Sequence, residues 1–314
     1  MSLRPFMPTN ALRIMLLAAL AMLLAGCPKP VTEINAFAKA SESVLDTTCK
    51  ALQSYEELSV SYSLFRIAKS KDQINSDMFK QSDKLIRPDT SKNKQLANDI
   101  AIRLKALAAM KKYAAALDSL AKADKTSDFK KSAESIKSSV NNLQVQAFGK
   151  SDPSFSAALG SLAYGVGKVV SEKIRFEGLK ISVSAADWPI QVLSKQMQKD
   201  SKEFAGAAKI RLDAMCTSNI SEYNDIRETN ISLEQKIKTL TEAKVSCQTV
   251  DKVETFAANV NKAAELFASA HEKIKTDLNA GITDFSNAKK TVDELIATGQ
   301  EVKEVYDDLI KAKK

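Results

Sequence analysis

Apolar side chains recur every three or four residues along most of this chain, and this period constrains the fold more than any other feature. Residues at this spacing lie on one face of an α-helix, which must be buried against a partner. The longest unbroken stripe consists of Leu212, Cys216, Asn219, Tyr223, Ile226, Asn230, Leu233, Ile237, Leu240, Lys244 and Cys247. We therefore predict long helices, and one continuous helix from about 190 to 247.

The composition also favours helices over sheets. The 314 residues include only nine Gly and seven Pro, and 6% of them are aromatic, whereas Ala, Lys, Ser, Glu and Leu are abundant. No stretch rich in Pro, Gly or Ser follows Thr32, so the pattern gives no sign of a linker between domains. The predicted fold class is all-α, an elongated, coiled-coil-like bundle of long antiparallel helices.

Breaks in the pattern predict the helix boundaries in the first half of the chain. The first helix is expected from Thr32 to about Leu85. It should end at Arg87-Pro88-Asp89, because proline disfavours helical geometry in the residue before it. Two further helices are expected to begin at about Thr90 and at Ser127, whose hydroxyl can accept a hydrogen bond from a free first-turn amide.

In the second half, Asp187-Trp188-Pro189 reads as a cap and a first-turn proline, so it is expected to open the helix that runs to Cys247. A turn at Gln248-Thr249 should then lead into the final helix. Gly281 and Gly299 lie in that helix and predict weak points or kinks, because glycine is a poor helix former.

The region 143–187 differs from the rest and is interpreted as a small irregular head. Apolar and polar residues alternate at 143–148 and at 179–184, and a two-residue period is typical of strands. A short two-stranded element is therefore expected there. The apolar segment 155–170 between them carries rows of small residues that allow close helix contact. It is either a short helix packed into the bundle or a segment that inserts into a membrane.

The leader has the layout of an export signal. Arg4 and Arg13 accompany an uncharged run at 14–24, and the sequence Leu24-Ala25-Gly26-Cys27 closes that run. This motif resembles the lipobox of bacterial lipoproteins. The resemblance implies diacylation of the Cys27 thiol, of the palmitate kind, and cleavage after Gly26. The alternative, a transmembrane helix that stays in place, needs about 20 apolar residues.

The resemblance divides the chain into a signal peptide (1–26), a lipid anchor and spacer (27–31) and a helical domain (32–314). It predicts a membrane partner, reached through the lipid on Cys27. The next residue is Pro28 and not an aspartate. In lipoproteins of two-membrane bacteria this implies the outer membrane, with the domain facing the periplasm. A one-membrane host is the alternative.

The other cysteines are expected to form a disulfide, since export leads to an oxidising compartment. If 190–247 is one helix, Cys216 and Cys247 lie about 46 Å apart and cannot bond. A bridge must then use Cys49. We predict a Cys49–Cys216 disulfide with Cys247 free, and the absence of any disulfide is the alternative.

The positive charge is concentrated in one segment. The formal net charge of +8 falls to +6 without Arg4 and Arg13 (8 − 2), and the segment 66–112 alone carries +7 (12 − 5). Five basic residues flank the expected bend, namely Lys80, Lys84, Arg87, Lys92 and Lys94. They predict a basic tip that binds an acidic envelope partner, such as cell-wall polymer, anionic lipid or an acidic protein. The alternative is an ordinary solvated face.

The sequence offers no catalytic or metal-binding pattern. The only histidine, His271, lies on an apolar stripe, which indicates a packed residue and not a base or ligand. Clustered metal ligands, phosphate-binding loops and nucleophile elbows are missing from the sequence, so we expect no cofactor and no enzyme. Nucleic acid is an unlikely partner, because few aromatic residues accompany the basic segment.

These patterns predict a membrane-anchored, non-enzymatic scaffold or binding protein of the bacterial envelope. The alternative is a membrane-active bundle. Long helices around an apolar segment are similar in architecture to the α-helical pore-forming proteins, although no motif is shared.

Overall fold

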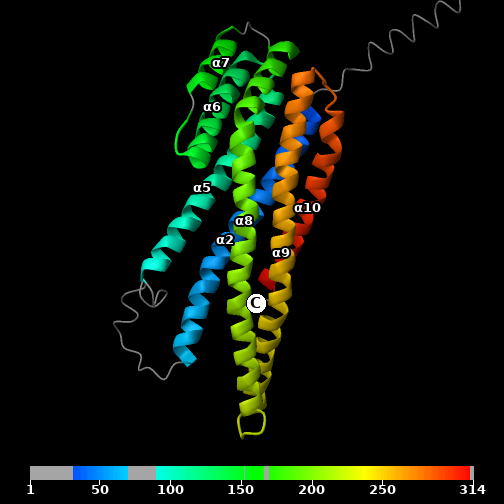
Figure 1. The fold of residues 1–314 in the computed structure, drawn as a ribbon. Coiled ribbons are helices and arrows are strands. Elements are labelled where there is room, and N and C mark those ends of the chain that lie inside the picture. Colours follow the sequence, from blue (N-terminus) through cyan, green and yellow to red (C-terminus); the bar gives the residue numbers. More distant parts are fainter. Residues whose placement is uncertain (1–30, 70–89, 152, 166–169, 312–314) are drawn as a thin grey trace, which may run out of the picture.

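The computed structural model describes residues 31–69, 90–151, 153–165 and 170–311, and the regular elements within these ranges are all helices. In chain order they are α2 (Val31–Lys69), α5 (Thr90–Ala121), α6 (Thr126–Phe148), α7 (Pro153–Tyr164), α8 (Glu172–Ile226), α9 (Leu233–Ala280) and α10 (Ser286–Lys311). Successive helices alternate in direction and form a long, narrow bundle (Figure 1). The predicted all-α fold of antiparallel helices is confirmed.

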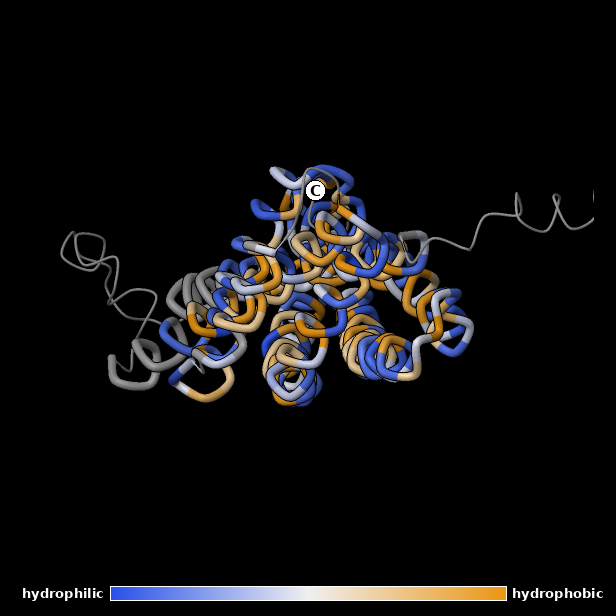
Figure 2. Tube along the Cα trace, turned by 90° about the horizontal axis from the view of Figure 1, so that it is seen from above, coloured by the Kyte–Doolittle hydropathy of each residue, from blue (hydrophilic) through white to orange (hydrophobic). Residues whose placement is uncertain are grey.

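The helices pair in a regular way. Helices α8 and α9 form a hairpin that extends beyond the rest of the bundle, while α10 and α2 lie along its upper part and α6 and α7 cover the start of α8 (Figure 1). Seen from above, the helices lie side by side, and hydrophobic and hydrophilic residues alternate around each of them (Figure 2). No helix in the described ranges is both long and apolar enough to cross a membrane.

The best-packed part of the bundle, which we call the upper core, is built around Phe37, Tyr113, Phe267 and His271. All four side chains are buried, and the rings of Phe37 and Phe267 stack with centroids 5.2 Å apart. They come from α2, α5 and α9, so this cluster joins helices that are distant in the sequence. Burial of large apolar side chains is the main force that holds such a bundle together.

Gly281 and Gly299, which were expected to be weak points in a helix, have other roles in the structure. Gly281 ends α9 with φ 73°, a left-handed conformation that glycine adopts without strain. The amide of the next residue, Ile282, donates to the Asp277 carbonyl, as in a helix C-cap. Gly299 lies inside α10, where an added Cβ would come 3.1 Å from Val44 Cγ2. It therefore lets α10 approach α2 closely.

The single helix expected from 190 to 247 is wrong. The chain reverses between α8 and α9, and Ser232 caps α9 by accepting a hydrogen bond from the Gln235 amide. A serine followed three residues later by glutamine is a known helix-start signal, so this boundary could have been predicted from the sequence. The expected turn at 248–249 lies inside α9. The apolar stripe runs unbroken through the turn only because both helices contribute residues at three- and four-residue steps.

The two-stranded element expected at 143–148 and 179–184 is also wrong. Both segments are helical, in α6 and in α8. Ser182 is buried in the core, where its hydroxyl donates to the Gly178 carbonyl at 2.6 Å. A serine that bonds to the preceding turn can occupy a buried helical position, and the alternation of polar and apolar residues is then misleading.

Other boundaries were predicted with mixed success. Helix α5 begins at Thr90, as expected, and α7 begins at Pro153. Helix α8 begins at Glu172, capped by Ser171, and passes through Pro189. The expected end of the first helix at about Leu85 and the bend at Arg87-Pro88 lie outside the described residues.

Candidate functional site

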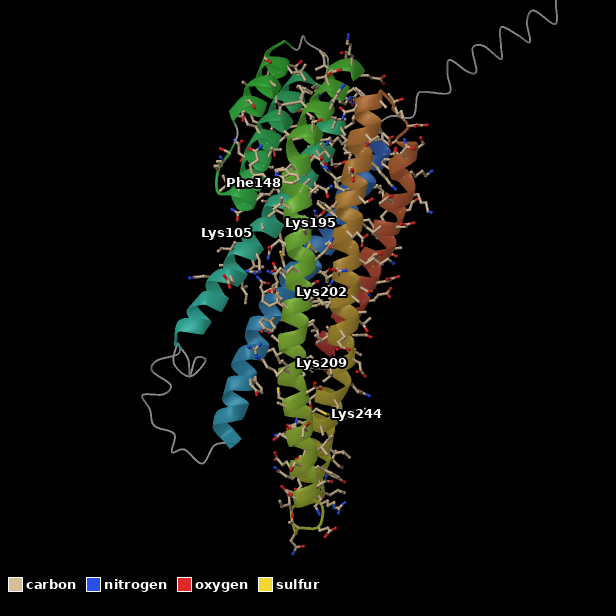
Figure 3. All side chains as sticks on the ribbon, viewed as in Figure 1. Lys105, Phe148, Lys195, Lys202, Lys209 and Lys244 are labelled. Atoms are coloured by element: carbon tan, nitrogen blue, oxygen red, sulfur yellow. A yellow bond between two sulfur atoms is a disulfide. The ribbon has the colours of Figure 1, made fainter. Side chains whose placement is uncertain are left out.

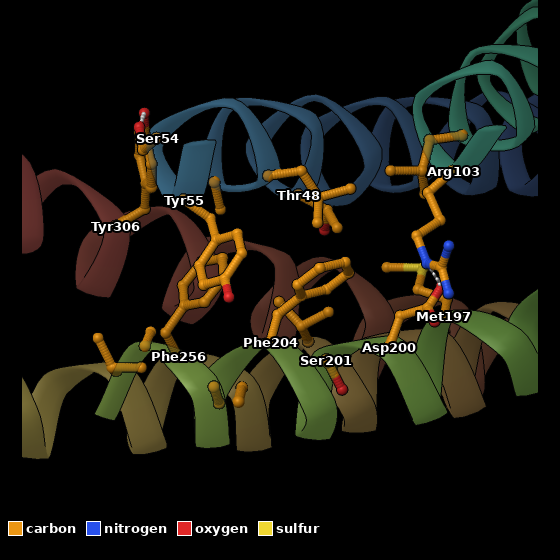
Figure 4. A pocket seen from close by; sticks show the side chains of 18 of the residues that line it. Thr48, Ser54, Tyr55, Arg103, Met197, Asp200, Ser201, Phe204, Phe256 and Tyr306 are labelled. Atoms are coloured by element: carbon orange, nitrogen blue, oxygen red, sulfur yellow. Dashed lines mark hydrogen bonds and ion pairs between the residues drawn. The ribbon is translucent and has the colours of Figure 1, made fainter. Parts of the chain in front are cut away.

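Below the upper core, five helices surround a cavity of about 160 Å³ (Figure 4). Helices α2, α5, α8, α9 and α10 all contribute to it, and its walls are mainly apolar. The larger apolar side chains are Leu52, Tyr55, Leu58, Leu107, Met110, Leu193, Met197, Phe204, Leu212, Val253, Phe256, Val260, Tyr306, Leu309 and Ile310. A concave apolar space with a few polar groups is the usual form of a small-molecule site.

The cavity exists because small side chains occupy positions on four of the surrounding helices. Ala51 of α2, Ala106 of α5, Ala205 and Ala208 of α8, and Ala257 of α9 all line it. Helices in a bundle pack at an interaxial distance of 8–10 Å that depends on the side chains at the contact. Larger side chains at these positions would fill the space.

The size of the cavity is functionally relevant. A cavity of about 150 Å³ lined by Leu, Ile and Phe stays dry in water and binds benzene. A bound apolar group would remove the apolar walls of the space from contact with water.

A half-buried ion pair lies in the wall of the cavity. Arg103 Nε of α5 lies 2.7 Å from Asp200 Oδ2 of α8, and the Asp200 side chain is 9% exposed. Gln196 donates to the other Asp200 oxygen at 2.8 Å, and the guanidinium lies 5.6 Å from the centre of the Phe204 ring. The pair bridges two helices and places a positive and a negative group together in the wall (Figure 4).

The Arg103 guanidinium still has donors to offer. Its Nη1 donates to the Asp99 carbonyl at 3.0 Å. Within the described part of the chain, its Nη2 has no recorded acceptor, although arginine carries five N–H donors in all. The pair adds no net charge to the wall of the cavity.

The other end of the cavity is bordered by tyrosines. Arg211 donates to the Tyr55 hydroxyl and lies 4.9 Å from the centre of that ring. Tyr306 of α10 lies 3.3 Å from Ser54 Oγ of α2. These contacts tie α8 and α10 to α2 and close this end (Figure 4).

The upper core contains a second polar network, which runs from the buried Tyr113 and His271 to the half-buried Asp187 and Lys275. His271 Nε2 lies 2.9 Å from the Tyr113 hydroxyl, and His271 Nδ1 lies 3.3 Å from Asp187 Oδ1. Lys275 donates to the other Asp187 oxygen at 2.6 Å. A neutral His271 that donates from Nδ1 to Asp187 and accepts at Nε2 from Tyr113 satisfies all three groups. This is the packed role that the sequence suggested for His271.

Burial and these contacts shift the pKa values of the network. Burial lowers the pKa of His271 and raises that of Tyr113 well above its usual value. The hydrogen bond from His271, helped by Lys275, lowers the pKa of Asp187 to about 2. The histidine is thus held neutral beside an ionised carboxylate.

The predicted Cys49–Cys216 disulfide is wrong. The structure links Cys216 to Cys247, with their Cα atoms 4.9 Å apart, and Cys49 is a free, half-buried thiol. The error follows from the helix drawn through 219–230. Once the chain reverses there, residues 31 positions apart face each other across the hairpin.

The other predicted site residues cannot be placed. Cys27 lies outside the described residues, as do Lys80, Lys84 and Arg87. Lys92 and Lys94 belong to α5, but their side chains are also outside the described part. A basic row that the sequence did not single out is described: Lys195, Lys202 and Lys209 follow each other along α8, with Lys105 and Lys244 on neighbouring helices (Figure 3).

Arg103 and Asp200 were not predicted as a pair. They lie 97 positions apart, and only the packing of α5 on α8 brings them together. Within the described ranges, no group of three or more His, Cys, Asp or Glu residues could hold a metal ion. The chain matches no protein-family model, no curated protein and no solved structure.

Proposed function

We propose that this chain is a non-enzymatic binding protein of the bacterial envelope, tethered to a membrane by a lipid on Cys27. The observation that carries the binding role is the apolar cavity between α2, α5, α8, α9 and α10. The Leu24-Ala25-Gly26-Cys27 motif supports the tether. The Cys216–Cys247 disulfide supports export, because such bonds are typical of oxidising compartments. Pro28 favours the outer membrane, facing the periplasm.

The architecture suits a tethered binding protein. Thr48, which lines the cavity, lies 17 residues after Val31, or about 25 Å along α2 at 1.5 Å per residue. The cavity would therefore stand clear of the anchoring membrane while remaining attached to it. In a water-filled compartment, an apolar ligand lowers its free energy when it moves from water into an apolar cavity.

Two experiments test the proposal separately. Cys27→Ser should yield an exported protein that is no longer membrane-bound, and continued sedimentation with membranes after a high-salt wash would contradict the tether. For the binding role, a solvent-sensitive apolar dye should fluoresce with the wild-type chain and much less with Ala106→Leu, which fills the cavity. Equal fluorescence with both proteins would contradict the binding role.

An acidic envelope partner at the basic tip is part of the same proposal. Replacing Lys80, Lys84, Arg87, Lys92 and Lys94 by Gln should abolish sedimentation with cell-wall or anionic-lipid preparations at low salt, because screened charges carry the contact. The far-ultraviolet circular dichroism should not change. A matched variant with Gln at Lys195, Lys202 and Lys244 distinguishes the tip from the basic row on α8. Binding that survives both sets of changes would contradict a charge-driven partner.

A membrane-active role is the second candidate, and one observation favours it. At the far end of the α8–α9 hairpin, Leu233, Ile237 and Leu240 form a stripe in which the side chains are 72%, 55% and 49% exposed. Phe267 in α9 stacks on Phe37 in α2, so this stripe begins about 60 Å along the bundle from Val31. Apolar side chains exposed in a row mark an interaction surface.

Vesicle leakage separates the two candidates. The binding proposal expects no release of dye from anionic vesicles by the unlipidated chain. Leakage that disappears in a variant with Ser at Leu233, Ile237 and Leu240 would support the membrane-active alternative instead.

A further inference from the structure

Among the described residues that line the cavity, four carry aromatic rings, and each ring comes from a different helix. Tyr55 belongs to α2 and Phe204 to α8, and their ring centroids lie 5.1 Å apart with the planes inclined by 60°. Phe256 belongs to α9 and Tyr306 to α10, and their centroids lie 6.3 Å apart with the planes inclined by 49° (Figure 4). The cavity therefore has aromatic groups in the walls formed by four of its five helices.

An aromatic occupant would make contacts in this cavity that a saturated occupant cannot make. The face of an aromatic ring is electronegative and its edge is electropositive, so two rings attract each other in tilted or offset arrangements beyond the effect of burial. Met110 and Met197 also line the cavity, and a thioether sulfur interacts favourably with an aromatic ring. These walls favour an aromatic ring over a saturated ring of the same size.

The volume of the cavity limits the size of the occupant. It is about 160 Å³, and an apolar protein cavity of about 150 Å³ binds benzene. A molecule with two fused rings would require the surrounding helices to move apart, and close-packed interiors resist such movement. The space therefore suits a single six-membered ring.

Polar side chains occur along the whole lining, and each has a partner within the protein. The hydroxyls of Thr48, Ser201 and Thr249 each donate to a carbonyl of their own helix, at 2.8, 2.9 and 2.7 Å. The other polar lining residues are paired as Arg103–Asp200, Gln196–Asp200, Tyr55–Arg211 and Ser54–Tyr306. A charged ligand would leave water for a wall in which the charges already balance, and this transfer costs free energy. The lining therefore favours an uncharged ligand.

We propose that the cavity binds one uncharged, monocyclic aromatic molecule of about the size of benzene. The inference rests on the proposed binding function and names its ligand class. The ring of the ligand would lie among the side chains of Tyr55, Phe204, Phe256 and Tyr306, and its binding would require no hydrogen bond from the protein.

The binding experiment compares benzene with cyclohexane. It uses the chain from residue 27 onward with Cys27→Ser, which retains every described helix because α2 begins at Val31. Headspace gas chromatography measures the free ligand above the protein solution. We expect one equivalent of benzene per chain, bound at least fivefold more tightly than cyclohexane, as one aromatic contact would give. Burial alone would favour cyclohexane, because the saturated ring has the larger apolar surface. Cyclohexane that binds as tightly as benzene would overturn the aromatic assignment.

Two further ligands test the limits of size and charge. Naphthalene has more apolar surface than benzene but should bind at least tenfold more weakly, because the second ring exceeds the space. Benzoate should show no binding in equilibrium dialysis at neutral pH. Naphthalene that binds as tightly as benzene would overturn the size limit, and benzoate that does so would overturn the preference for an uncharged ligand.

Two alanines of α5 provide a matched pair of variants. Ala106 lines the cavity, whereas Ala108 is exposed on the same helix. Ala106→Leu should weaken the binding of benzene at least tenfold, and Ala108→Leu should leave it unchanged. Circular dichroism and urea midpoints would show that both variants are folded. Wild-type affinity in Ala106→Leu would overturn the proposed site.

The contribution of the aromatic wall is tested at Phe204. Phe204→Leu keeps an apolar side chain in the wall but removes one ring, so the affinity for benzene should fall about threefold to fivefold. The affinity for cyclohexane should change by less than twofold. An equal loss for both ligands would show that Phe204 only shapes the cavity and would contradict ring–ring recognition.

The same ligands separate failure of this inference from failure of the proposed function. If cyclohexane or naphthalene binds at least as tightly as benzene and Ala106→Leu blocks it, the ligand class is wrong and the binding function stands. If benzene, cyclohexane and naphthalene all fail to bind, both are wrong.

Discussion

The upper core and the cavity are surrounded by largely the same helices, yet one is filled and the other is not. In the upper core, α2, α5 and α9 contribute Phe37, Tyr113 and Phe267, all fully buried or nearly so. Several turns lower, the same three helices contribute Ala51, Ala106 and Ala257. Helix arrangement is common to the two regions. Side-chain volume alone therefore separates a packed core from a cavity.

The polar groups of the two regions differ in the same way. In the upper core, Tyr113, His271, Asp187 and Lys275 satisfy one another in a continuous chain of contacts. At the cavity, Arg103 holds Asp200 but keeps a donor without an acceptor among the described residues. A completed network stabilises the fold, whereas an incomplete one beside empty space is available to a ligand.

The largest expected effect comes from opening a cavity in the upper core. Phe267→Ala should lower the free energy of unfolding by about 3–5 kcal/mol, because the stacked ring leaves a space that the enclosed core cannot close. The matched change Phe204→Ala enlarges a cavity that already exists and should cost about half as much or less. Urea denaturation measures both, and equal losses would mean that the two regions are packed alike.

The second effect concerns the lower end of the bundle. Cys216→Ser with Cys247→Ser removes a crosslink that closes a loop of about 30 residues, which contributes about 3.7 kcal/mol on chain-entropy grounds. The change should speed amide exchange in 213–247 and leave exchange near His271 unaltered. The control Cys49→Ser should affect neither region. Faster exchange in the upper core as well would show that the hairpin and the core unfold as one unit.

Acid should weaken the upper core by a somewhat smaller amount. The pKa of His271 is lowered by burial, so the unfolded chain binds a proton below about pH 6.5 that the folded chain resists. Stability is then complete above pH 6.5 and falls as the pH drops, by at most about 1.4 kcal/mol per unit. We therefore expect the free energy of unfolding to decrease between pH 7 and 5 in urea titrations.

His271→Gln provides the control for this pH dependence, because it should flatten the slope between pH 6.5 and 5. The lowered pKa of Asp187, about 2, acts in the same direction but at lower pH, since its stabilisation is lost as the pH falls from 4 toward 2. An unchanged slope in His271→Gln would mean that other groups carry the acid sensitivity.

The smallest effect gives the most direct comparison of the two regions. The same substitution, Ala to Leu, should change the free energy of unfolding in opposite directions at two positions of one helix. Ala106→Leu adds methyl and methylene groups to empty space and should raise the free energy of unfolding by about 1–2 kcal/mol. Ala114→Leu, in the packed part of α5, should lower it by about 1–3 kcal/mol through overcrowding. The same sign for both changes would contradict the contrast between the two regions.

The periodicity of apolar residues predicted the fold class because this period follows from the local geometry of the helix. The starts of α5 at Thr90 and α7 at Pro153 were also predictable, since caps and first-turn prolines act locally. The reversal between α8 and α9 was missed although Ser232 and Gln235 mark it, because the apolar stripe gave a stronger and misleading signal.

The candidate site was not predictable from the sequence. Nothing local to Arg103 indicates Asp200, and an alanine that lines a cavity looks the same in the sequence as one that allows close helix packing. A cavity is formed by side chains of several helices that lie at the same level along the bundle axis. The level of a residue along that axis can be predicted only when the boundaries of its helix are correct.

Cys49 has a consequence for how the chain acquires its crosslink. Burial in the wall of α2, reinforced by Asp46, raises the pKa of its thiol to about 11. At neutral pH only about one molecule in ten thousand then carries the nucleophilic thiolate, so thiol–disulfide exchange at this residue is slow once α2 has docked. Cys216 and Cys247 belong to one hairpin and can pair before α10 is in place. The free thiol of Cys49 therefore need not cause scrambled products during oxidative folding, provided that the hairpin and α2 form early.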